Sequence, residues 1–90
     1  LSDAIGNETI RLADGVKKRF NLKYRPVVPS TDTTAVTILD ATGANVTVNT
    51  VSISNDDNMR VAYIEIDPPP PANGSIKVSY QRLLAEFVKP

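Results

Sequence analysis

Phe20-Asn21-Leu22-Lys23-Tyr24 and Ser75-Ile76-Lys77-Val78-Ser79-Tyr80 are the two stretches that decide the fold of this chain. In both, every second side chain is apolar and the positions between are polar or small. Because successive side chains of a β-strand point to opposite faces, this alternation predicts two half-buried strands. A turn sequence precedes each stretch, Asp14-Gly15 in the first case and Pro71-Ala72-Asn73-Gly74 in the second.

Short segments rich in valine, isoleucine and threonine lie before, between and after these turns. Such β-branched residues suit a pleated, half-buried surface, and they predict strands at residues 8–12, 16–24, 35–40, 46–54, 59–67 and 75–80. Within 46–54 the apolar positions change parity, from Val46 and Val48 to Val51 and Ile53, which predicts a bulge near residues 49–50. A hairpin is expected around Gly43. About six short strands predict an all-β fold, a small antiparallel β-sandwich or barrel.

A chain of 90 residues is long enough for one domain. We expect a flexible N-terminal arm at residues 1–6, the β-sandwich at 7–80, and a C-terminal arm or short helix at 81–90. The last segment has an apolar spacing that would place its apolar residues on one side of a short helix. Two interpretations remain open: the segment closes its own sandwich, or it packs onto a neighbouring subunit.

The composition argues against catalysis. Histidine and cysteine are both absent, which removes the commonest general base, the usual nucleophile pairs and nearly all zinc sites. We therefore predict no enzyme activity, no catalytic or metal site, no cofactor and no small-molecule substrate. Ten basic and ten acidic residues cancel, which argues against a nucleic-acid partner. No apolar run reaches the roughly 18 residues of a membrane helix, so no membrane partner is expected.

The positive charges are concentrated early in the chain, between residues 17 and 25. One interpretation is an electrostatic contact with an acidic partner or with the acidic half of another copy. The other is a solvated strand face that discourages edge-to-edge pairing. The candidate residues are Lys17, Lys18, Arg19, Lys23 and Arg25.

The opening and closing motifs resemble a small β-sandwich module found in virion structural proteins of tailed bacteriophages. The resemblance rests on Asp-Gly, a Phe-x-Leu-x-aromatic strand followed by Pro-Val, and Pro-Ala-x-Gly ahead of a strand that ends in Val-x-Tyr. It covers residues 14–80, and its core positions here are Phe20, Leu22, Tyr24, Pro26, Gly74, Val78 and Tyr80. The chain departs from the pattern in its Pro68–Pro71 run and in continuing ten residues past Tyr80.

This resemblance implies a virion structural protein, made in the host cytoplasm and located in the virion. The first expectation is a capsid decoration or cement subunit that binds between capsid subunits, with the major capsid protein or other virion subunits as partners and a homo-oligomer in the particle. The alternatives are a tail, baseplate or head–tail junction subunit, and a surface carbohydrate-binding module. The candidate subunit or capsid interface consists of Leu1, Ile5, Leu83, Leu84, Phe87 and Val88.

Overall fold

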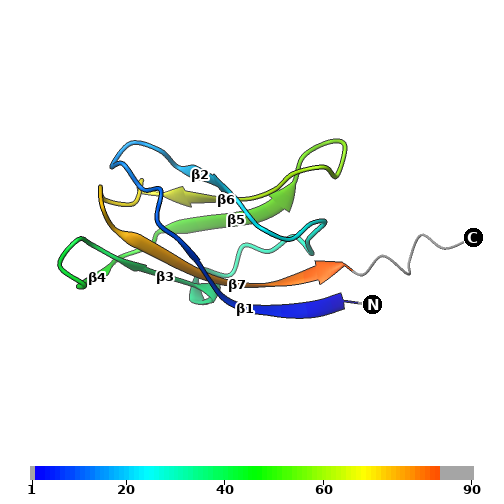
Figure 1. Cartoon of the computed structure of the whole chain (residues 1–90), viewed down its shortest axis with the longest axis horizontal. Helices are drawn as coiled ribbons and strands as arrows, with labels where there is room; N and C mark the ends of the chain where they lie inside the picture. The colour runs from blue at the N-terminus through cyan, green and yellow to red at the C-terminus, as the bar shows by residue number, and fades with distance from the viewer. Residues whose placement is uncertain (1, 84–90) are drawn as a thin grey trace, which may run out of the picture.

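Two antiparallel β-sheets form the fold of residues 2–83, the part of the chain that this computed structural model describes (Figure 1). Short local alternation and frequent turn residues favour strands over helices here, and the described helical content is one 3₁₀ turn, η1 (Thr33–Ala35). The strands are β1 (Ser2–Ile10), β2 (Arg19–Asn21), β3 (Val36–Leu39), β4 (Asn45–Val46), β5 (Thr50–Asn55), β6 (Ala62–Asp67) and β7 (Ser75–Leu83).

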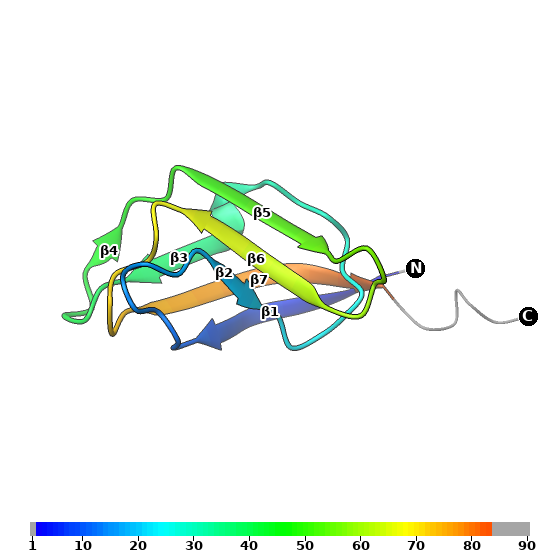
Figure 2. The ribbon, with the colours of Figure 1, turned by 90° about the horizontal axis from the view of Figure 1, so that it is seen from above.

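The first sheet has the order β1-β7-β3-β4, and the second has the order β2-β6-β5. Every pairing within them is antiparallel. Seen from above, β5 and β6 cross over β7 at an angle, as expected when two twisted sheets pack face to face (Figure 2). The predicted all-β antiparallel sandwich is thus confirmed.

The core lies between the sheets and is built from the alternating positions that the sequence marks. Phe20 of β2, Ile64 and Ile66 of β6, and Ile76 and Val78 of β7 are each at most 1% exposed. Burying an aliphatic or aromatic side chain of this size contributes about 1.5–3 kcal/mol. β6 is the centre of its sheet, as its apolar residues suggest, although its strand begins at Ala62 rather than at residue 59.

The predicted strand at 46–54 is divided between two strands in different sheets, and the predicted bulge near residues 49–50 is wrong. The hairpin around Gly43 exists, because Ile38 pairs with Val46, but β4 ends at Val46. The chain then crosses to the other sheet, where Val51 and Ile53 of β5 are buried. A crossing between facing sheets reverses which parity points into the core, so it leaves the same mark in the sequence as a bulge.

The predicted loose arm at residues 1–6 is also wrong for the residues described. β1 begins at Ser2 and pairs with β7, which itself runs on to Leu83, so residues 81–83 are strand rather than arm or helix. Main-chain pairing needs no apolar side chains, and this half of β1 offers few. Beyond Ile10 the expected strand stops, and the side chain of Leu12 is 68% exposed. Residues 84–90 lie outside the described part of the chain.

Candidate functional site

The start of β1 and the end of β7 lie together at one end of the sandwich (Figure 1). Ser2 pairs with Leu83, Asp3 with Arg82, and Ile5 with Tyr80. The side chains reinforce this register: Ser2 donates a 2.9 Å hydrogen bond to Gln81, and Arg82 forms a 3.3 Å ion pair with Asp3. Both ends of the described chain therefore leave the domain side by side.

A buried tyrosine ties β1 to the segment that follows β2. The Tyr80 hydroxyl donates a hydrogen bond to the Glu8 carboxylate and accepts one from the main-chain N–H of Tyr24, at 3.3 Å. The other Glu8 oxygen accepts from the N–H of Lys23, at 3.0 Å. Burial, and secondarily the hydrogen bond to Glu8, raises the pKa of Tyr80 above its ordinary value. Tyr80 is therefore a neutral structural donor at physiological pH.

The segment from Pro26 to Ser30 connects the two sheets at the same end. On one side, the Val28 N–H bonds to the Gln81 carbonyl and the Leu83 N–H bonds to the Pro26 carbonyl, at 2.9 and 2.8 Å. On the other side, Ser30 exchanges two main-chain hydrogen bonds with Ile53 of β5. The prolines at 26 and 29 have no main-chain N–H to donate, so the pairing of this segment with the two sheets is limited to these few hydrogen bonds.

A groove of about 430 Å³ lies between this segment, the start of β1 and the second half of β7. Along β7, the groove lies between two positions that have neighbours on this side. One is paired with Val36, the first residue of β3, and the other accepts a hydrogen bond from the N–H of Val28. The lining of the groove is mostly apolar. Polar groups beside it form hydrogen bonds within the chain. The Ser79 hydroxyl accepts one from the Asn7 N–H, and the Asp32 carboxylate accepts two from the N–H and hydroxyl of Thr34. The apolar lining residues are Ala4, Ile5, Val28, Pro29 and Ala35.

The predicted interface residues are only partly within the described chain. Ile5 is half-buried and lines the groove, and Leu83 is half-buried at the end of β7. Leu1, Leu84, Phe87 and Val88 lie outside the described residues. The wall of the groove at Val28 has no clear signal in the sequence, because prolines on either side of the Val27-Val28 pair interrupt its strand-like pattern.

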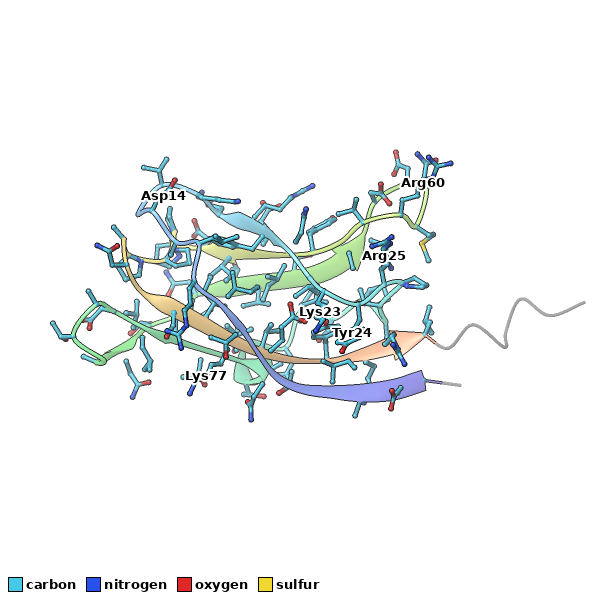
Figure 3. All side chains as sticks on the ribbon, viewed as in Figure 1. Asp14, Lys23, Tyr24, Arg25, Arg60 and Lys77 are labelled. Atoms are coloured by element: carbon cyan, nitrogen blue, oxygen red, sulfur yellow. The ribbon has the colours of Figure 1, made fainter. Side chains whose placement is uncertain are left out.

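The predicted electrostatic residues do not form one patch. Arg19 lies 3.9 Å above the ring centre of Tyr63 and forms a 2.8 Å ion pair with Glu65, while Lys18 pairs with Asp67 at 3.1 Å. These contacts neutralise the outer face of the three-stranded sheet. Lys23 and Arg25 lie beyond β2, farther along the molecule toward the terminal end (Figure 3). Lys17 lies 5.2 Å from the ring centre of Phe20.

The predicted core motif is brought together. Phe20, Leu22, Gly74, Val78 and Tyr80 are buried, and Tyr24 and Pro26 are half-buried beside them. These positions hold the sandwich closed rather than forming a site.

Two further features, a metal-ligand group and a membrane-spanning helix, can be assessed for residues 2–83. They contain no group of three or more histidine, cysteine, aspartate or glutamate side chains placed to hold a metal ion. No helix among them has the length and apolarity to span a bilayer. The candidate site is the terminal end of the domain, with its paired strands and apolar groove.

Comparison of the chain with models of protein families, with curated proteins and with solved structures finds no match.

Proposed function

We propose that this chain is a non-enzymatic virion structural protein, a capsid decoration or cement subunit that binds between capsid subunits and stabilises the particle. The observation that carries the proposal is the terminal end of the sandwich, where the paired ends of β1 and β7 lie beside an apolar groove. The resemblance of the Phe20–Val27 and Pro71–Tyr80 motifs to phage virion modules supports it.

The mechanism is binding by burial of apolar surface. Groove residues such as Val28, Pro29 and Ala35 would contact the partner, and the sequence continues past Leu83 with Leu84, Phe87 and Val88. Each apolar side chain removed from water contributes about 1.5–3 kcal/mol before the cost of association. Repetition over a lattice adds avidity, so a weak single contact suffices to strengthen a shell.

Copy number in purified particles tests the proposal. Quantitative mass spectrometry on virions from the producing host is expected to find the chain in hundreds of copies, as a shell requires. About six or twelve copies would instead match a tail, baseplate or head–tail ring. Absence from the particle, or saturable glycan binding by the isolated protein, would overturn a virion role.

A pair of matched variants tests the groove itself. Pro29→Arg adds a long charged side chain at the rim of the groove and removes no main-chain donor, since proline has none. Ala41→Arg adds the same charge in the exposed β3–β4 turn at the other end of the molecule (Figure 1). We expect Pro29→Arg to lose binding to particles that lack the subunit and Ala41→Arg to keep it. Equal binding by both variants would remove the groove from the contact.

A further inference from the structure

One edge of β1 has no main-chain partner among residues 2–83. The other sheet edges are short or already paired. β4 has two residues and β2 has three, and the edge of β5 is paired with Ser30 by two main-chain hydrogen bonds of 2.8 and 2.9 Å. β1 has nine residues and is the edge strand of its sheet, and Figure 1 shows its first half at the outside, beside β7. A long open edge is a template for another strand.

The hydrogen bonds of β7 identify which groups of β1 face outward. Gln81 and Leu83 direct their main-chain groups to the Pro26–Val28 segment, so Tyr80 and Arg82 direct theirs to β1. Their partners Ile5 and Asp3 must then point inward to β7. By alternation, the N–H and C=O groups of Ser2 and Ala4 point away from the sheet.

The usual protection of an edge strand is weak at this position. Open edges commonly carry lysine, proline or an unpaired charge that repels a second strand. The first half of β1 holds one charged residue, Asp3, and Arg82 of the same chain neutralises it at 3.3 Å. The protective feature that does exist is the bulge after Ile5, where the register with β7 shifts and Asn7 has a φ of 52°. It limits any added strand to residues 2–6.

We propose that a second copy of this chain occupies this edge, with β1 antiparallel to β1 about a two-fold axis at Ala4. The first sheet of each copy then joins into one continuous sheet. The proposal goes beyond the virion role and does not rest on it, because it concerns the isolated protein.

The residues of this edge are compatible with self-pairing in one register. Centring the axis on Ala4 places Ala4 opposite Ala4 of the other copy and Ser2 opposite Gly6, so only small side chains meet at the hydrogen-bonded pairs. Asp3 then faces Ile5 rather than a second Asp3. Centring the axis on Asp3 would set two carboxylates directly opposite each other, which is destabilising. An isologous contact of this kind closes on itself and stops at a dimer.

The contact is small, so the dimer is weak. Five residues a side bury far less than the roughly 1,600 Å² of a standard interface. We expect a dissociation constant of about 0.1–1 mM, which places the monomer–dimer transition within reach of NMR concentrations.

Amide hydrogen exchange of the full chain tests the proposal without any substitution. Between about 20 µM and about 1 mM protein, exchange of the Ala4 amide should slow several-fold, while that of its neighbour Ile5, already bonded to β7, should not change. Ala4 exchange that does not depend on concentration overturns the proposal. The proposal is also overturned if the Ala4 amide is protected from exchange at the lowest concentration, where the protein is monomeric. That result would mean that another segment of the same chain pairs with the edge of β1.

Two substitutions at the same residue provide the matched control. Ala4→Pro removes the outward N–H, and proline is tolerated on an edge strand whose donor faces solvent. Ala4→Val keeps the donor and favours a strand. Sedimentation velocity should show the concentration-dependent dimer for the native chain and Ala4→Val, and a monomer for Ala4→Pro. A dimer that persists in Ala4→Pro with Tyr80 and Ile5 amides still protected would overturn the β1 contact.

Discussion

The phenolic hydroxyl of Tyr80 donates a hydrogen bond to the carboxylate of Glu8, although the two residues are separated by 72 positions in the sequence. This bond links β1 to β7, two strands from opposite ends of the sequence. The same hydroxyl accepts a hydrogen bond from the N–H of Tyr24. The Glu8 carboxylate also accepts a hydrogen bond from the N–H of Lys23. One buried hydroxyl therefore organises the contact between the edge strand, the sheet centre and the loop after β2.

Replacing Tyr80 with phenylalanine should destabilise the domain by about 1–3 kcal/mol, because the substitution leaves Glu8 and the Tyr24 N–H each short of one hydrogen-bond partner. Urea unfolding followed by circular dichroism measures the change. Tyr63→Phe is the control, since the Tyr63 ring lies under Arg19 on the outer face and the substitution retains that ring and its stacking. Equal losses in the two variants would contradict a special role of Tyr80.

The same residue should make stability fall at alkaline pH. Burial and the Glu8 hydrogen bond raise the pKa of Tyr80 in the folded state above its ordinary value of 10.0. Above pH 10 the unfolded chain has released this proton while the folded protein still holds it, so the free energy of unfolding decreases as pH rises. Urea unfolding between pH 8 and 11 should show the decrease, and Tyr80→Phe should flatten it.

Much of this fold could be predicted from local alternation, and the remainder depends on pairing between distant residues. Phe20, Leu22, Ile76 and Val78 alternate with polar residues, and they are in the core as expected. Ser2 to Gly6 lacks such a pattern because β7, not its own side chains, makes it a strand. The site was less predictable from the sequence. The groove exists because Val28 takes the place of β3 as the neighbour of β7, and no local sequence pattern indicates this change of neighbour.

Acid should destabilise the turns, four of which are held by an aspartate side chain that is exposed or half-buried. In the β3–β4 turn, the Thr42 hydroxyl and then the N–H groups of Ala44 and Thr42 bond to Asp40 and lower its pKa. The pKa values of Asp14, Asp32 and Asp56 are lowered by similar bonds.

Because these folded-state values lie below the ordinary 3.8, the stabilisation is present above that pH and is lost as pH falls through the lowered pKa values. Asp40→Asn keeps an acceptor oxygen but has no charge to titrate. Its unfolding free energy, measured between pH 2 and 6, should fall less steeply than that of the native chain. Identical slopes would show that Asp40 does not contribute to the acid response.

Gly74 should tolerate no side chain. A Cβ atom at this position would lie 2.5 Å from the Leu39 carbonyl oxygen and 3.0 Å from that of Pro71, both main-chain atoms that cannot move aside cheaply. We expect Gly74→Ala to cost about 1–3 kcal/mol or more, measured by thermal and urea unfolding. Gly6→Ala is the control, because a Cβ atom on Gly6 would have no neighbour within 4 Å among the described residues. A Gly74→Ala protein as stable as Gly6→Ala would contradict the close approach of β3 to this turn.

The wall of the groove should depend on one amide side chain. Asn55 accepts a 2.8 Å hydrogen bond from the Val27 N–H and donates a 2.9 Å bond to the Val27 carbonyl, so it replaces a neighbouring strand for that residue. Asn55→Asp keeps the acceptor but loses the donor, and it sets a carboxylate beside a carbonyl oxygen. We expect a loss of about 1–3 kcal/mol and faster amide exchange at Val28 and Ser30, which Val27 positions between the sheets. Asn58→Asp in the exposed β5–β6 loop adds the same charge and should leave those amides unchanged. If exchange at Val28 is the same in both variants, the sheets themselves, and not Asn55, hold the groove open.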